Sequence, residues 1–249
     1  MIYVGGDSYT YGIELGDPLK SRYSFLMQKK LKMSVVNDSW GGASNDRIAR
    51  KFLEFMNGNK VKPDLVFIMW APVTRSEQYA PEENMWEEQD GFRQVRSPDI
   101  FLPAKVKPTK KQIHWRQSLA QLSATQKWWL NIFDPKGAID SYIRNIMIIQ
   151  TVCRAGNIPF IMTNCNSSMT FNQLNDFIYR NRRVENYTQR RVNLIDSSNW
   201  LFDKTWSFAE WAKDNKYPIG PQFHPLEEAH RNFANILTDK VKEKINASD

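Results

Sequence analysis

The feature that most constrains the fold of this chain is a series of short strand-like segments that are apolar on both faces. The clearest is the run DLVFIMW at residues 64–70, and similar segments lie at residues 1–4, 34–37, 158–163 and 192–196. A strand without a polar face has to be covered on both sides, which is typical of parallel strands in α/β proteins. The chain is therefore expected to build a buried parallel sheet.

Helical patterns alternate with these strands and supply the covering layers. Apolar residues recur at helical spacing in four stretches: Tyr23, Leu26, Met27 and Leu31; Ile48, Phe52, Phe55 and Met56; Ile139, Tyr142, Ile143, Ile146 and Cys153; and Phe233, Ile236, Leu237, Val241 and Ile245. This alternation predicts an α/β fold with a single doubly wound (flavodoxin-like), five-stranded parallel sheet and helices on both faces. Residues 1–249 are expected to form one domain, whose size allows a substantial core.

Residues 76–137 interrupt the alternation after the third strand. The segment is much longer than a crossover requires and contains four tryptophans, an acidic block at 77–90 and a basic block at 105–116. We expect a Trp-rich insertion at the C-terminal edge of the sheet, partly helical at about 109–132. We expect it to cover an active site, to pack as a peripheral subdomain, or to do both.

The charge and cysteine content limit the partners and cofactors to consider. A net charge of +7 permits contact with nucleic acid or anionic glycans without requiring it, and the basic clusters at 105–116 and 180–191 are equally typical of solvated faces. Two cysteines and three histidines predict neither a disulfide framework nor a metal site, and no cofactor is expected.

The sequence shows no targeting segment. Residues 1–7 lack a basic region, and no stretch approaches about 18 consecutive apolar residues. We therefore expect a cytoplasmic protein that makes no membrane contact.

A serine follows the first strand in a glycine-lined turn, in the order Gly5-Gly6-Asp7-Ser8. Ligands of open α/β sheets bind at the carboxyl ends of the strands. Ser8 is therefore a candidate nucleophile, and its backbone N–H can point at an oxyanion. The alternative is that these residues form an ordinary turn.

A histidine lies just before the last predicted helix. His224 precedes Pro225, which suits the first turn of a helix, and a loop histidine at this place can act as a general base. The alternative is a capping or surface histidine. His230 is expected to be structural, because a spacing of six residues does not place both histidines on one helix face for a metal.

The turn after the second strand reaches the same edge of the sheet as Ser8. Gly42 offers an unhindered backbone N–H and Asn45 a side-chain amide, and both groups are common components of an oxyanion hole. A glycine-rich turn with a capping asparagine is the alternative.

Taken together, these residues resemble the SGNH (GDSL-like) hydrolase family. The matching residues, in the family's order, are Gly6-Asp7-Ser8, Asn37 with Gly42, and His224-Pro225. The resemblance spans the chain outside residues 76–137. In detail the chain is similar to divergent SGNH-like proteins of tailed bacteriophages, and this similarity implies a location in the host cytoplasm or the virion. It also implies that Ser8 is the nucleophile, that His224 is the base, and that the N–H groups of Ser8 and Gly42 hold the oxyanion.

Two positions depart from the family's pattern. Pro221 stands where the family has an Asp three residues before its histidine, and residues 70–77, at the end of the third strand and directly after it, contain no Asn. A backbone carbonyl near Pro221 or Gln222 could orient the imidazole, and Asn45 or Arg75 could replace the missing oxyanion donor, whose loss costs on the order of 10²–10³ in rate. Arg75 and Asp7 are also predicted to bind substrate, although an ion pair with Glu77 is an alternative for Arg75.

Three functions remain open at this point. The first is a serine esterase that cleaves an acyl ester through an acyl-Ser8 intermediate, with an O-acetylated carbohydrate as one candidate substrate, or an acyltransferase that uses the same residues. The second is a catalytically weakened module on the same fold that binds a glycan or a nucleic acid. The third is association with nucleic acid through the basic clusters, which strong salt dependence would support.

Overall fold

The computed structural model describes residues 1–59, 61–73, 75–79, 92–96, 135–166, 193–202 and 207–247. In chain order the elements are β1 (Ile2–Gly5), α1 (Ser8–Tyr11), α2 (Pro18–Ser21), α3 (Tyr23–Leu31), β2 (Val35–Asn37), α4 (Asn45–Gly58), β3 (Leu65–Trp70), β4 (Arg75–Tyr79), β5 (Phe92–Arg96), α7 (Pro135–Ala155), β6 (Phe160–Asn164), η2 (Ser197–Asn199), α10 (Phe208–Asp214) and α11 (Glu227–Asn246).

Four of the strands form one parallel sheet in the order β2-β1-β3-β6. In its register Val4 pairs with Asn37 on one side and Phe67 on the other, and Phe67 also pairs with Ile161. Every residue of β3 is buried, as its continuous apolar sequence requires. These observations confirm the predicted α/β fold and its parallel sheet.

The fifth predicted strand, at residues 192–196, is not found: residues 193–196, the part described, do not form a strand. The side chain of Gln150 donates to the carbonyl of Leu194 at 2.9 Å and accepts from the N–H of Asp196 at 2.8 Å. Backbone groups that a strand would use are therefore bonded to a side chain. The place beside β6 is taken by isolated parallel bridges at Trp200 and Ser207.

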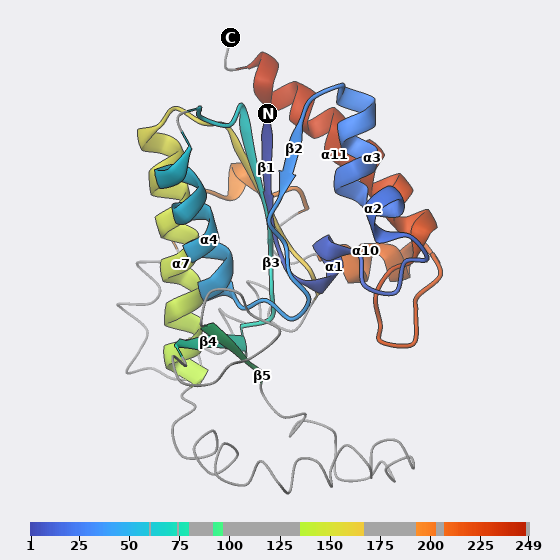
Figure 1. Cartoon of the computed structure of the whole chain (residues 1–249), viewed down its shortest axis with the longest axis horizontal. Helices are drawn as coiled ribbons and strands as arrows, with labels where there is room; N and C mark the ends of the chain where they lie inside the picture. The colour runs from blue at the N-terminus through green and yellow to red at the C-terminus, as the bar shows by residue number, and fades with distance from the viewer. Residues whose placement is uncertain are drawn as a thin grey trace, which may run out of the picture.

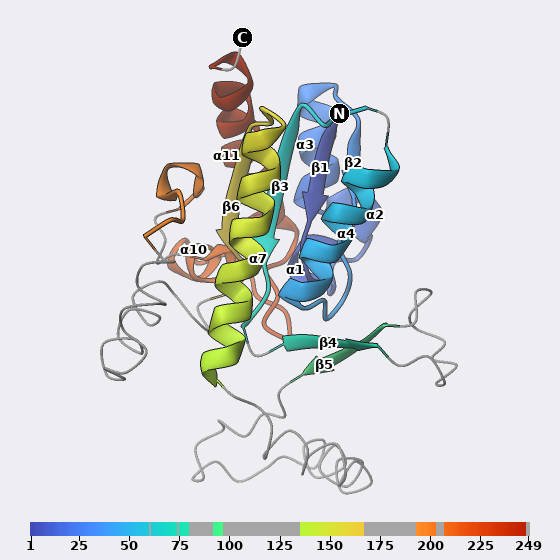
Figure 2. The ribbon, with the colours of Figure 1, turned by 90° about the vertical axis from the view of Figure 1, so that its left-hand side faces the viewer.

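Helices cover both faces of the sheet, and each face has its own core (Figures 1 and 2). Alternation along β1 shows the division: Tyr3 packs with Phe52 of α4 in one core, whereas Ile2 and Val4 join the other core with Phe233 of α11. α4 and α7 lie on the first face, and α3 and α11 on the second. This confirms the predicted helices on both faces.

The strands all end at one edge of the sheet, so the loops after β1, β2, β3 and β6 gather there. β4 and β5 pair as an antiparallel hairpin that follows β3 beyond this edge (Figure 2). The hairpin belongs to the predicted insertion, and α7 begins at Pro135, just inside its predicted end. The four tryptophans of the insertion, its predicted helix and both basic clusters lie outside the described residues.

No helix in the described ranges is long and apolar enough to cross a membrane.

Candidate active site

Ser8 is held at the start of α1, directly beyond the carboxyl end of β1. Asp7 caps this short helix by accepting a hydrogen bond from the N–H of Tyr9 at 3.1 Å. Ser8 is buried but lines a pocket of about 640 Å³ at the edge of the sheet. The strand, the cap and the helix therefore fix the backbone of Ser8 and present its hydroxyl to the pocket.

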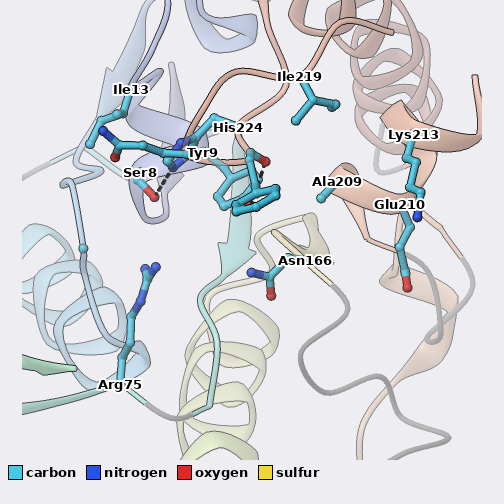
Figure 3. A pocket seen from close by; sticks show the side chains of 13 residues that line it. Ser8, Tyr9, Ile13, Arg75, Asn166, Ala209, Glu210, Lys213, Ile219 and His224 are labelled. Atoms are coloured by element: carbon cyan, nitrogen blue, oxygen red, sulfur yellow. Dashed lines mark hydrogen bonds between the residues drawn. The ribbon is translucent and has the colours of Figure 1, made fainter. Parts of the chain in front are cut away.

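His224 reaches Ser8 from the loop that precedes α11. Its Nε2 lies 2.9 Å from Ser8 Oγ, and Figure 3 shows the two side chains joined at one end of the pocket. The ring packs against Tyr9, with centroids 4.6 Å apart, and the Tyr9 hydroxyl donates to the carbonyl of Phe223 at 3.3 Å. Burial raises the pKa of Tyr9, so its hydroxyl stays protonated and can keep donating.

The other nitrogen of the imidazole faces a carboxylate that sequence reasoning did not identify. Nδ1 of His224 lies 2.8 Å from Glu14 Oε2. An ionised carboxylate only accepts hydrogen bonds, so Nδ1 carries a proton, and in the neutral imidazole Nε2 then offers its lone pair to the Ser8 hydroxyl. Within the described part of the chain, the group that bonds to Nδ1 is therefore Glu14 and not a backbone carbonyl near Pro221 or Gln222.

Glu14 also holds the backbone of the histidine loop. Its Oε1 accepts from the N–H of Gln222 at 2.9 Å and its Oε2 from the N–H of His224 at 3.2 Å. Burial alone would raise the pKa of Glu14, but these hydrogen bonds from Gln222 and His224 lower it below its ordinary value. The carboxylate is therefore charged across the neutral range.

Two backbone features let Glu14 reach the loop. Glu14 itself has φ 73, a left-handed conformation that is uncommon outside glycine and that redirects its side chain after α1. On the other side Gly220 leaves room for the carboxylate, because a Cβ there would lie 2.8 Å from Glu14 Oε2. The glutamate and the glycine thus fit each other across the two loops.

Two backbone N–H groups that line the pocket have no partner within the described part of the chain. They belong to Ser8 and to Gly42, and none of the hydrogen bonds of the described residues uses them. Gly42 has φ 86, which suits glycine and turns its peptide in this loop. Backbone donors are rarely left unused, so this pair is available to an oxyanion.

Asn45 is placed away from this pair. Its side-chain amide donates to the carbonyl of Ala71 at 3.0 Å and accepts from the N–H of Ala71 at 2.9 Å, and it does not line the pocket. The amide thus connects the start of α4 to the end of β3. The cap of α4 is Ser44, whose side chain accepts from the N–H of Arg47, and not the asparagine.

Asp7 and Arg75 bind each other. Nη1 of Arg75 donates to Asp7 Oδ2 at 2.8 Å, and the Asp7 side chain is completely buried. Asp7 therefore does not face the pocket as a substrate-binding residue, because it is used to hold the arginine and to cap α1. Arg75 does line the pocket, and it forms an ion pair with Asp7; the side chain of Glu77, the alternative partner, lies outside the described residues.

His230 lies in a core and takes no part in the pocket. Its Nδ1 accepts from the N–H of Tyr23 at 3.2 Å, and its ring stacks on Tyr23. Burial and, less strongly, the nearby His224 lower its pKa to about 3. This matches the structural role expected for it. Among the described residues, no group of three His, Cys, Asp or Glu side chains is arranged to hold a metal.

The pocket residues that the sequence analysis did not identify are those whose positions depend on loop conformation. Glu14 had one weak signal, since it is an acid shortly after the nucleophile in a turn that begins at Gly12. Asn166, just after β6, also lines the pocket, and Figure 3 shows its amide inside it. Position at the carboxyl end of a buried strand was the available signal for Asn166.

No family model matches the chain, and no curated protein sequence matches it significantly. Solved structures do match. TesA is 14% identical with a TM-score of 0.52, over 97% of this chain and 98% of that one. The psychrotrophic esterase EstA from Pseudoalteromonas sp., inhibited by monoethylphosphonate, is 12% identical with a TM-score of 0.49, over 98% of each chain.

A member of the lipolytic G-D-S-L family from Veillonella parvula DSM 2008 is 11% identical with a TM-score of 0.46, over 96% of each chain. The likeness to TesA extends over nearly the whole of both chains at low sequence identity. This likeness concerns the fold alone. None of these matches supports the expected bacteriophage origin.

Proposed function

We propose that this protein is a serine ester hydrolase in which Ser8, His224 and Glu14 act together as a catalytic triad. The observation that carries the proposal is the unbroken contact from Ser8 Oγ to His224 Nε2 at 2.9 Å and from Nδ1 to Glu14 Oε2 at 2.8 Å. Serine, base and orienting acid within hydrogen-bond reach are the arrangement that activates a weak oxygen nucleophile.

In the first half of the reaction Ser8 Oγ attacks the ester carbonyl while its proton passes to Nε2 of His224. The resulting oxyanion accepts hydrogen bonds from the N–H groups of Ser8 and Gly42. When the carbon–oxygen bond to the alcohol breaks, the imidazolium returns the proton to the leaving oxygen. The acyl group is then bound to Ser8 as an ester.

In the second half a water molecule attacks the acyl-Ser8 ester and gives its proton to His224. The tetrahedral intermediate collapses, the proton returns to Ser8 Oγ, and a carboxylic acid leaves. Glu14 stabilises the imidazolium that forms in each half while keeping its own charge. A second alcohol in place of water would make the same residues an acyltransferase.

The pocket favours an alcohol that has an apolar face. Phe223 is 77% exposed and Ile219 is 38% exposed, and both line the same pocket as His224, the residue proposed to protonate the leaving alcohol. Aromatic rings with this exposure can stack on the C–H face of a sugar. An O-acetylated carbohydrate is therefore our candidate substrate.

The experiment that tests this function is labelling with a fluorophosphonate, followed by mass spectrometry of the modified peptide. The wild type is expected to carry the label on Ser8, and Ser8→Ala and His224→Ala to carry none while remaining folded. Ser8→Ala is also expected to lose turnover of p-nitrophenyl acetate. A folded wild type that is neither labelled nor active would refute the proposal and would direct attention to binding of intact glycans or nucleic acids.

A further inference from the structure

Arg75 lines the same pocket as Ser8 and Gly42, whose backbone N–H groups are unused among the described residues. Its Nη1 donates to Asp7 Oδ2 at 2.8 Å and to the carbonyl of Ala43 at 3.3 Å. Asp7 directly precedes Ser8, and Ala43 directly follows Gly42. Figure 3 shows the guanidinium end of Arg75 pointing toward Ser8. The two anchors of the arginine are thus the neighbours of the two proposed oxyanion donors.

The chemistry of a guanidinium leaves donors free for a substrate. Its five N–H groups all donate and none accepts, and the two bonds to Asp7 and Ala43 both use Nη1. Within the described ranges no hydrogen bond uses the remaining nitrogens, Nη2 and Nε. The side chain is only 17% exposed, so these N–H groups are held in place rather than moving freely in solvent.

We propose that Arg75 is the third oxyanion donor, replacing the asparagine amide that the sequence lacks after the third strand. The inference rests on the proposed function, because the oxyanion forms on an ester attacked by Ser8. As negative charge develops on the carbonyl oxygen, Arg75 donates to it alongside the N–H groups of Ser8 and Gly42. Asp7 acts as a positioning residue, since it fixes the guanidinium before substrate arrives.

The other role for a pocket arginine is recruitment of an anionic substrate, and the ion pair argues against it. The completely buried carboxylate of Asp7 neutralises most of the field that Arg75 would project into the pocket. An arginine that attracts anionic substrates would be weakened by a neighbouring carboxylate, because the negative charge reduces the positive potential in the pocket. A donor that must be fixed within a few tenths of an ångström of a developing oxyanion does gain from it, because preorganisation is what makes such donors effective.

Steady-state kinetics of Arg75→Ala on a neutral and an anionic ester test the assignment. With p-nitrophenyl acetate we expect kcat to fall by on the order of 10²–10³, the cost of one oxyanion donor, with KM little changed. We expect the same loss of kcat with p-nitrophenyl succinate. Added guanidinium ion at concentrations that do not unfold the protein is expected to restore part of the activity, whereas sodium chloride at equal ionic strength is not.

A matched control removes another arginine with an ion pair of the same length. Arg154 lies 2.8 Å from Asp196, at the end of α7 that leads into the first residue of β6 and so at the opposite edge of the sheet. Arg154→Ala is expected to keep the wild-type kcat. If Arg75→Ala does not fold because Asp7 is left unpaired, the double variant Arg75→Met with Asp7→Asn removes both charges and keeps an oxygen to cap α1. It is expected to show the same loss of kcat.

Three outcomes would overturn the inference. One is wild-type kcat on the neutral ester in Arg75→Ala. A second is a rise in KM confined to the succinate ester, which would make Arg75 an anion-recruiting residue. A third is a loss of kcat that guanidinium does not rescue and that follows a loss of thermal stability, which would make its role structural. If the wild type itself were neither active nor labelled on Ser8, the proposed function would fail and this inference with it.

Discussion

Replacing Glu14 by glutamine should lower kcat for ester hydrolysis by about 10³- to 10⁴-fold in a protein that still folds. Glutamine keeps the length of the side chain and one carbonyl oxygen, but it brings an NH₂ donor to a site where the three neighbouring groups all donate. Those groups are the N–H of Gln222, the N–H of His224 and the Nδ1–H of His224. One of them must lose its acceptor whichever way the amide turns.

The magnitude follows from two terms. The first is the attraction between the Glu14 carboxylate and the imidazolium that forms during the reaction, across an N–O contact of 2.8 Å. For charges about 4 Å apart at an effective dielectric of about 20 this is about 4 kcal/mol, or roughly 10³ in rate. The second depends on how the amide turns. With its oxygen on Nδ1, only the N–H of Gln222 loses its acceptor and the tautomer is kept. With its NH₂ on Nδ1, the proton moves to Nε2, which then cannot accept from Ser8, and losses of this kind reach about 10⁴.

The assay is steady-state hydrolysis of p-nitrophenyl acetate by the wild type, Glu14→Gln and the control Glu227→Gln. Glu227 accepts from the N–H of Gly16 at 2.8 Å, so it also holds the segment after α1, but it does not contact His224. The control is expected to keep its kcat. Near-wild-type kcat in Glu14→Gln would refute the reasoning, and equal losses in both variants would show that the segment, and not the carboxylate, is what matters.

Three further perturbations have defined expectations. Gly220→Ala is expected to lower kcat with little change in KM, because the added Cβ would lie 2.8 Å from Glu14 Oε2 and displace the carboxylate; the same assay measures it. Phe223→Asn is expected to raise the free energy of unfolding by about 1 kcal/mol, since Phe223 has φ 67 and Asn tolerates that conformation, and to raise KM for a glycan ester. Denaturant unfolding and kinetics check the two parts, and a fall in stability would contradict the first. His230 has a pKa of about 3 in the folded protein against an ordinary value of 6.5, so folding favours its neutral form. Its contribution to the free energy of unfolding is complete above pH 6.5. This contribution falls by up to about 1.4 kcal/mol per pH unit as the pH drops toward 3. His230→Asn is expected to flatten this slope between neutral pH and about pH 5, above the range in which the lowered pKa of Glu14 contributes, and an unchanged slope would show that other groups cause it.

The parts of the molecule that the sequence predicted well are those set by repeating apolar patterns. The continuous apolar run of β3 and the helical stripe of α7 identify buried elements whatever their neighbours are, and parallel topology then brings the loops after β1 and β3 to one edge. The approach of Ser8 and His224 follows the same logic. The prediction of the fifth strand was wrong: within residues 193–196, the carbonyl of Leu194 and the N–H of Asp196 are hydrogen-bonded to the side chain of Gln150, a contact that no local pattern encodes.

The parts that could not be predicted depend on the direction of single side chains. Asn45 and Arg75 both follow strands that end at the site, but the amide of Asn45 turns to Ala71 and only Arg75 enters the pocket. Asp7 is next to Ser8 in sequence, yet its carboxylate points into the protein and is completely buried. Glu14 contacts His224 from a left-handed backbone conformation, which its sequence does not require.

The geometry of the site is set by bonds between two short segments more than by the sheet. Residues 7–14 supply the proposed nucleophile, its helix cap and the proposed orienting acid, and residues 220–224 supply the proposed base. Glu14 binds the second segment through three donors, and the Tyr9 hydroxyl adds a fourth bond through the carbonyl of Phe223. An acid placed three residues before the histidine would orient the imidazole without tying its loop to the nucleophile. In this chain the same carboxylate does both, so a change that loosens the loop must also disturb the tautomer, and stability of the loop and kcat are expected to fall together in variants of either segment.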